Sequence, residues 1–277
     1  MEPPSQNNFD VFAPSVIAER VEQVGVVKAS MPFRQMVMLG FLAGSFIGFG
    51  ALANNLVLAD PMPSLAATRI LGGVVFSLGL ILVVIAGAEL FTGNNLVVMA
   101  YVDRRISFWM LCRSWVIVLV SNFAGALFLA WLVWMSGYGE LISGKVGEKL
   151  LATAQSKCLL SADRAFFSGI LCNILVCLAV WMTFAGHSVT DKMLAIILPI
   201  TVFVAAGFEH SIANMFTLPL AWMLQHDALF AQYKNAISLS GMLHNLIPVI
   251  AGNLVGGGIF VGLVYYLVYG GNLNKKE

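Results

Sequence analysis

Long runs without a charged residue dominate the chain. Charge-free intervals of 25, 26 and 26 residues lie at 35–59, 114–139 and 165–190. A helix needs about 20 mostly apolar residues to cross the hydrocarbon core of a bilayer, so each interval predicts one membrane-spanning helix. A fourth interval, at 235–274, contains His244 and Pro248. We expect one span there, from about Asn245 to Tyr269, after a polar approach.

Two further apolar intervals are interrupted by charge. Residues 70–102 contain Glu89, and residues 193–226 contain Glu209 next to His210. Each interval is too long for one simple helix and too short for two helices with a loop. A helix that is broken at mid-membrane fits both. The pattern therefore predicts six spans, of which the second and the fifth are broken.

The two interruptions are similar in sequence. Gly87-Ala-Glu-Leu-Phe-Thr-Gly-Asn94 matches Gly207-Phe-Glu-His-Ser-Ile-Ala-Asn214, with Gly, Glu and Asn at the same offsets. Three spans in each half is an odd number, so the second half enters the membrane inverted. Inverted repeats with discontinuous helices are typical of channels and secondary transporters. The predicted fold class is an all-α integral membrane protein with six transmembrane helices in an inverted 3+3 repeat, helices 2 and 5 being broken at mid-membrane.

The composition excludes several classes of protein. Of the 277 residues 59% are hydrophobic and 10% are charged, whereas soluble domains carry roughly 25% charged residues. A water-soluble enzyme is therefore excluded, and the net charge of +1 gives no support to nucleic-acid binding. The sequence has no HExxH, no GxSxG and no CxxC motif. We expect no enzyme activity, no metal and no cofactor.

The domain organisation follows from the spans. We expect an N-terminal segment at 1–34 with an amphipathic helix over Pro14–Ser30, a six-span channel domain at 35–270 and a short tail at 271–277. Six spans place both termini on one side, which has nine Lys and Arg residues against six on the other. The positive-inside rule then predicts cytoplasmic termini. The N-terminal helix either lies at the bilayer surface or acts as a mobile gate over the pore.

Ionisable residues inside a span are costly and are functional candidates. Glu89 and Glu209 occupy equivalent repeat positions, which favours a structural role in which each carboxylate accepts hydrogen bonds from N–H groups freed at a helix break. His210 has no such counterpart, because Leu90 stands at the matching position. It is either a neutral histidine bonded to nearby backbone or a donor or proton source for a passing anion. Helix N-termini at the breaks also favour an anion.

Polar and bulky apolar side chains surround the two interruptions. The hydroxyl of Thr92 and the amide of Asn173 either line the pore or pack against other helices. Four apolar side chains are candidates for dry constrictions: Phe76, Leu80, Leu90 and Phe203. A bare anion loses its hydration in such a ring, and protonation removes that cost. The pattern therefore favours pH-dependent or proton-coupled passage of a weak acid.

At these residues the chain resembles the formate/nitrite transporter family, and most of all its formate channels. The resemblance rests on the two interruption segments quoted above, and on Cys172-Asn-Ile-Leu-Val-Cys177 and Asn245-Leu-Ile-Pro248 with their continuations. It implies a symmetric pentamer of aquaporin-like protomers in a bacterial inner membrane, each with its own pore for formate, nitrite, lactate, acetate or hydrosulfide.

The resemblance also implies roles for single residues. His210 is the expected central histidine, Thr92 its hydrogen-bonding partner, Asn173 a polar pore residue and Lys157 a vestibule lysine that attracts anions. The expected structural residues at the breaks are Glu89, Asn94, Glu209 and Asn214, and the four apolar side chains are expected to form two constrictions.

The sequence thus predicts transport of a small monovalent anion, formate first, with protons and the lipid bilayer as further partners. Nitrite or hydrosulfide would suit the same pore, and a water or neutral-solute channel would share the architecture. Aquaporins, however, rely on paired Asn-Pro-Ala turns, and neither interruption contains proline.

Overall fold

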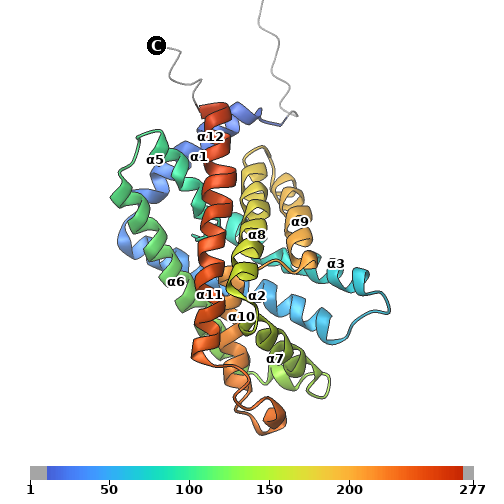
Figure 1. Ribbon diagram of the computed structural model, residues 1–277. Coiled ribbons are helices and arrows are strands. Elements are labelled where there is room, and N and C mark those ends of the chain that lie inside the picture. Colours follow the sequence, from blue (N-terminus) through green and yellow to red (C-terminus); the bar gives the residue numbers. More distant parts are fainter. Residues whose placement is uncertain (1–10, 271–277) are drawn as a thin grey trace, which may run out of the picture.

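The computed structural model describes residues 11–270, and these residues form helices and connecting loops without a strand (Figure 1). Six helical stretches are long and apolar enough to cross a membrane, which confirms the predicted number. They are Phe33–Ala59, Leu65–Gly87, Phe108–Met135, Ala162–Thr183, Val189–Ala206 and Leu239–Tyr269. The predicted tail at 271–277 and the first ten residues of the predicted N-terminal segment lie outside the described residues.

The first half contains three spans preceded by a shorter helix. Its elements are α1 (Pro14–Ala29), α2 (Phe33–Ala59), α3 (Leu65–Phe76), α4 (Leu78–Ile81), the π-helix η1 (Leu82–Gly87), the 3-10 helix η2 (Gly93–Val97), α5 (Val98–Val102) and α6 (Phe108–Met135). The second span therefore consists of α3, α4 and η1 before its break and of η2 and α5 after it.

The second half repeats this plan. Its elements are η3 (Tyr138–Glu140), α7 (Lys145–Cys158), α8 (Ala162–Thr183), α9 (Val189–Ala206), α10 (Ser211–Leu224), η4 (Ala228–Tyr233), α11 (Leu239–Leu254), the π-helix η5 (Val255–Leu263) and α12 (Val264–Tyr269). The fifth span is α9 and α10 with a break between them, as predicted, and α11, η5 and α12 form one continuous sixth span.

Both breaks follow a glycine in the left-handed region. Gly87 ends η1 with a φ of 84°, and Gly207 follows α9 with a φ of 77°. Only glycine adopts this conformation without a steric cost, so it can reverse the direction of the chain at a helix end. The residues that follow, Ala88 to Leu90 and Phe208 to His210, are not helical. The matching glycines in the sequence therefore mark the two points where the spans break.

Glycines also allow close packing of the equivalent helix pair within each half. Helix α2 packs against α6, and α8 packs against α11. A Cβ on Gly44 would overlap the carbonyl of Asn122 across the first pair, and one on Gly252 would overlap the carbonyl of Phe166 across the second. The helices can approach this closely only because these positions have no side chain.

The sixth span begins earlier than the hydrophobic pattern predicts. Helix α11 starts at Leu239, six residues before Asn245, so the expected polar approach is itself helical. The hydroxyl oxygen of Ser238 accepts a hydrogen bond from the N–H of Gly241 at 3.1 Å and caps this helix. Pro248 lies inside α11 without ending it. The difference arises because an N-cap, rather than the first strongly apolar residue, defines the helix start.

Two shorter amphipathic helices lie at opposite ends of the molecule (Figure 1). Helix α1 covers the predicted range and packs against η2, α5 and α12. Helix α7 was not predicted; it buries one face, formed by Val146, Leu150, Leu151 and Ala154, against α2, α10 and α11. The helical spacing of these apolar residues between Gly144 and Leu159 is the signal for it.

Candidate functional site

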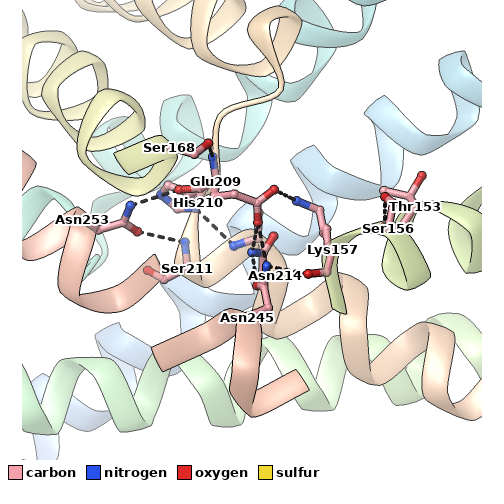
Figure 2. A network of polar contacts seen from close by, with 11 residues as sticks. Thr153, Ser156, Lys157, Ser168, Glu209, His210, Ser211, Asn214, Asn245 and Asn253 are labelled. Atoms are coloured by element: carbon pink, nitrogen blue, oxygen red, sulfur yellow. Dashed lines mark hydrogen bonds and ion pairs between the residues drawn. The ribbon is translucent and has the colours of Figure 1, made fainter. Parts of the chain in front are cut away.

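The second break carries a buried carboxylate that binds one cation and two amides. Glu209 Oε1 lies 2.6 Å from Nζ of Lys157 on α7. Its Oε2 accepts hydrogen bonds from Asn214 Nδ2 at 2.6 Å and from Asn245 Nδ2 at 3.2 Å (Figure 2). The side chain of Glu209 is 6% exposed and that of Lys157 is 19% exposed. The carboxylate is therefore fully partnered, as a buried charge requires.

The first break carries a matching arrangement, with one amide instead of two. Glu89 Oε1 lies 2.8 Å from Nζ of Lys28 on α1, and Glu89 Oε2 accepts a hydrogen bond from Asn94 Nδ2 at 2.7 Å. Lys28 also donates to Asn94 Oδ1 at 2.9 Å. We call Lys28, Glu89 and Asn94 the first carboxylate cluster, and Lys157, Glu209 and Asn214 the second. The two clusters have the same residue types in the same roles.

One asparagine holds the open backbone at each break. Asn122 on α6 donates to the carbonyls of Gly40 at 2.7 Å and Glu89 at 2.8 Å, and its Oδ1 accepts from the N–H of Phe91 at 2.9 Å. The bonds to Glu89 and Phe91 satisfy backbone groups that the missing helical turn leaves without partners, and the bond to Gly40 ties the break to α2.

Asn253 on α11 makes the equivalent three bonds at the second break. It donates to the carbonyls of Gly169 at 2.8 Å and Glu209 at 3.0 Å, and it accepts from the N–H of Ser211 at 2.9 Å (Figure 2). Asn122 and Asn253 begin the matching segments Asn122-Phe-Ala-Gly125 and Asn253-Leu-Val-Gly256, and each one bridges a break.

Thr92 and His210 connect the two breaks. Thr92 Oγ1 lies 3.1 Å from His210 Nε2, although the residues are 118 positions apart. The other ring nitrogen, Nδ1, accepts a hydrogen bond from the N–H of Ala213 at 3.1 Å and thereby caps α10. A neutral imidazole with Nδ1 as acceptor carries its proton on Nε2. His210 therefore donates to the Thr92 hydroxyl oxygen, and the Thr92 hydroxyl proton remains available for a further acceptor.

Asn173 joins this central pair through the backbone. Its Nδ2 donates to the carbonyl of Thr92 at 3.2 Å and to that of Asn253 at 2.6 Å. Asn173 and Thr92 are both fully buried, and His210 is 3% exposed. The structure thus brings Thr92, Asn173 and His210 into one cluster at the junction of the two breaks.

Two cavities lie on either side of this junction. The first, of about 480 Å³, is lined by the first carboxylate cluster and by Leu80 and Leu90. The second, of about 350 Å³, is lined by the second carboxylate cluster, by His210 and by Phe76 and Phe203. Each cavity therefore combines a lysine and a carboxylate with one pair of the predicted constriction residues. Arg69 and Lys149 add further positive charge to the second cavity.

The apolar pairs stand directly beside the central cluster. The rings of Phe76 and Phe203 meet edge to face with their centroids 5.5 Å apart, and the ring of Phe203 stacks on His210 at 5.8 Å. All four predicted constriction side chains are buried. The leucine pair thus lines the first cavity and the aromatic pair the second, and Phe203 contacts His210.

Helix α1 adds a titratable group near the first cavity. Glu22 is buried, and burial raises the pKa of its carboxyl from 4.5 to about 7, with a further contribution from the nearby Asp103 carboxylate. Arg105 acts in the opposite direction. On the same helix Val21, Val24, Gly25 and Lys28 line the first cavity. The protonation of Glu22 can therefore affect how α1 sits against that cavity.

Sequence reasoning missed Lys28 as a site residue. The signal for Lys28 is its spacing from Lys157, which is 129 positions. Gly40 and Gly169 have the same spacing, and their carbonyls accept hydrogen bonds from the equivalent asparagines Asn122 and Asn253. Within residues 11–270, no group of three or more His, Cys, Asp or Glu side chains is arranged to hold a metal ion.

Six apolar spans in an inverted repeat, with two broken helices and a polar cluster at their junction, define a membrane channel or transporter. The family described as Formate/nitrite transporter matches residues 15–267, and the chain belongs to this family. It is 37% identical to the formate channel FocA of Escherichia coli K12, with 96% of this chain and 97% of that protein covered.

Two further comparisons agree. The chain is 44% identical to the formate channel FocA of Haemophilus influenzae over 71% of this chain and 72% of that protein. A solved structure described as a pentameric formate channel with formate bound superposes with a TM-score of 0.78 and 40% identity, covering 86% of this chain and 97% of that one. The protein is therefore a multi-pass membrane transporter rather than an enzyme.

Proposed function

We propose that this protein carries a small monovalent anion, formate first, across a bacterial cytoplasmic membrane. The observation that supports this most directly is the contact between Thr92 Oγ1 and His210 Nε2, which lies between two cavities that each contain a lysine. The formate channels to which the chain is similar support formate as the substrate.

The chemistry of the site suits a carboxylate. Lys157 lines the second cavity as the expected vestibule lysine. Because Glu209 neutralises its charge, Arg69 and Lys149 supply the net positive charge that attracts the anion there. At the aromatic pair the anion loses most of its water, which is costly for a charge. The free hydroxyl proton of Thr92, with His210 donating to the same oxygen, offers the anion a hydrogen bond at this point.

The geometry also favours a pH-dependent passage. A carboxylate that takes up a proton crosses the apolar pairs as a neutral acid, without the cost of carrying a charge. His210 at rest gives a hydrogen bond rather than a proton, because its Nδ1 is occupied by the N–H of Ala213. The anion held at the Thr92–His210 contact takes up its proton from solution, so flux follows the pH and depends on His210.

We further propose a homopentamer with one pore in each protomer and both termini in the cytoplasm. The pentameric formate channel with a TM-score of 0.78 supports the assembly. The outward face of α6 supports it too, because it exposes an apolar stripe that suits lipid or a neighbouring subunit: Val116, Val120, Phe123, Leu127 and Trp131. The excess of Lys and Arg on the terminal side supports the orientation.

The test is a panel of substrates in one proteoliposome preparation. Formate, nitrite, hydrosulfide, lactate and acetate are compared by stopped-flow across a range of pH, with protein-free vesicles as the background. We expect the fastest flux for formate and a flux that changes with pH. His210→Ala should lower formate flux and flatten the pH profile, whereas the exposed His226→Ala should change neither.

Two outcomes contradict the proposal. If formate crosses no faster than in protein-free vesicles while nitrite or hydrosulfide does, the substrate is wrong. If His210→Ala keeps both the rate and the pH profile of the unmodified protein, the central histidine has no part in transport.

A further inference from the structure

The two halves of the repeat can be compared residue by residue. Gly40 on α2 and Gly169 on α8 accept from the two equivalent asparagines, so α8 corresponds to α2 with an offset of 169 − 40 = 129. Glu89 and Glu209 set the offset at the breaks to 209 − 89 = 120. Every residue of the first carboxylate cluster has the same residue type as its partner in the second under this correspondence.

Four polar residues at the centre have an apolar or glycine counterpart instead. His210 corresponds to Leu90, and Thr92 corresponds to Ile212. On α8, Asn173 corresponds to Gly44 and Cys177 corresponds to Gly48. A symmetric architecture does not need these four side chains, since the other half is built without them. Polar groups that break the symmetry are therefore candidates for the function of the pore, whereas those that obey it are candidates for its scaffold.

These four residues form one connected group. Thr92 Oγ1 contacts His210 Nε2 at 3.1 Å, and the carbonyl of Thr92 accepts hydrogen bonds from Asn173 Nδ2 and from Cys177 Sγ, both at 3.2 Å. Cys177 is fully buried. Its thiol is thus one of two side-chain donors to the carbonyl of Thr92, whose hydroxyl contacts His210.

The packing behind Cys177 keeps the thiol in place. A Cβ on Gly257 of η5 would lie 2.6 Å from Cys177 Sγ and would overlap Asn173 Nδ2. The π-helix therefore reaches this point closely only because it has glycine there. Cys172, on the same helix, is equally buried but makes no hydrogen bond within residues 11–270. The two thiols differ in their contact with Thr92, not in their burial.

We propose that Cys177 is a positioning residue for transport: its thiol, with the amide of Asn173, fixes the backbone of Thr92 so that the Thr92 hydroxyl meets His210 and the passing anion. This inference rests on the proposed function of the Thr92–His210 pair. The alternative is that Cys177 only fills space, and that role would depend on the volume of the side chain and not on its donor.

The first experiment compares three variants in proteoliposomes. Cys177→Ala removes the donor, Cys177→Ser keeps a donor of similar size, and Cys172→Ala is the matched control for loss of a buried thiol. A net hydrogen bond corresponds to a change of roughly twofold to tenfold in an equilibrium. We expect Cys177→Ala to lower formate flux by about that factor and to shift its pH profile, while Cys177→Ser and Cys172→Ala stay within about twofold of the unmodified protein.

The outcomes separate the inference from the proposed function. If the unmodified protein carries another anion of the panel but no formate, the substrate is wrong, and the same three variants are compared with that anion. If Cys177→Ala behaves like Cys172→Ala, or if Cys177→Ser loses as much flux as Cys177→Ala, the positioning role is overturned.

A second measurement does not depend on transport. Two variants each keep one of the four cysteines, Cys177 or Cys172, with the others replaced by alanine. Infrared absorption of the S–H stretch should lie at lower wavenumber for Cys177 than for Cys172, because a hydrogen bond to a carbonyl weakens the S–H bond. The same band position for both thiols would show that Cys177 makes no such bond.

Discussion

Lys28 and Lys157, 129 positions apart, bind equivalent carboxylates at the two helix breaks. Each Nζ lies within 2.8 Å of a glutamate Oε1, and in each case the other oxygen of that glutamate accepts from an asparagine. Because Lys28 lies on α1 and Lys157 on α7, the two amphipathic helices are counterparts. The repeat unit is therefore an amphipathic helix followed by three spans. A gating role for α1 stays a prediction, and any movement of α1 must break the Lys28–Glu89 ion pair.

Lys28→Met should destabilise the protein because it leaves Glu89 without its cation. Removing one partner of a largely buried pair costs about 1–3 kcal/mol or more. Adding Glu89→Gln should restore much of that loss, because a neutral amide needs no counter-charge. Thermal unfolding of the two single variants and the double variant in detergent gives the coupling free energy between Lys28 and Glu89. Losses that simply add, with no recovery in the double variant, would show that the ion pair does not contribute to stability.

Asn122→Ala and Asn253→Ala should destabilise the protein to a similar extent. Each removes an amide that makes three hydrogen bonds to backbone groups, two of them at a break, and each unpaired buried group costs about 1–3 kcal/mol. The measurement is the thermal unfolding of both variants. A much larger effect at one site than at the other would contradict the equivalence of the two breaks.

Glu22→Gln should remove a pH dependence from the packing of α1. Burial raises the pKa of the Glu22 carboxyl from 4.5 to about 7. A carboxyl with a raised pKa binds its proton more tightly in the packed state, so packing is most stable below about pH 4.5 and weakens as the pH rises towards 7. Asp103, Arg105, Glu19 and Tyr266 are the other titratable groups near it.

Hydrogen–deuterium exchange of α1, corrected for the intrinsic pH dependence of exchange, tests this prediction. In the unmodified protein we expect faster exchange at pH 8 than at pH 5.5. Glu22→Gln should give slow exchange at both values, and Glu19→Gln on the same helix should behave like the unmodified protein. If Glu22→Gln keeps the original pH dependence, another group controls the packing of α1.

Phe203→Ala should weaken the selection of substrates by size. The ring of Phe203 packs against Phe76 and His210, and its removal opens the aromatic pair. We expect the ratio of lactate flux to formate flux to rise several-fold. The upper limit is about tenfold, which corresponds to a change of about 1.4 kcal/mol in relative free energy. Phe167→Ala, at an exposed position on α8, is the control. An equal fall in both fluxes would indicate a collapsed pore rather than a widened one.

The pattern of charge along the sequence was sufficient to predict the six spans, the two breaks and the glutamates within them. These features are local: hydrocarbon thickness sets the length of an apolar run, and a charge inside such a run stands out by its cost. The repeat could also be recognised in the sequence, because matching residues such as Gly87 and Gly207 adopt the same backbone conformation in each half. His210 stood out for the same reason, since Leu90 occupies its matching position.

The tertiary structure alone decided which side chains meet. The family resemblance implied that Thr92 bonds to His210, but no spacing in the sequence shows that the two lie 3.1 Å apart, or that Lys28 pairs with Glu89, 61 positions away. Nor does it show that the thiol of Cys177, and not that of Cys172, donates to the carbonyl of Thr92. A hydrogen bond depends on donor and acceptor being about 3 Å apart and correctly aligned. That geometry arises only when helices distant in the sequence pack together, whereas the apolar pattern of one helix is a property of that segment alone.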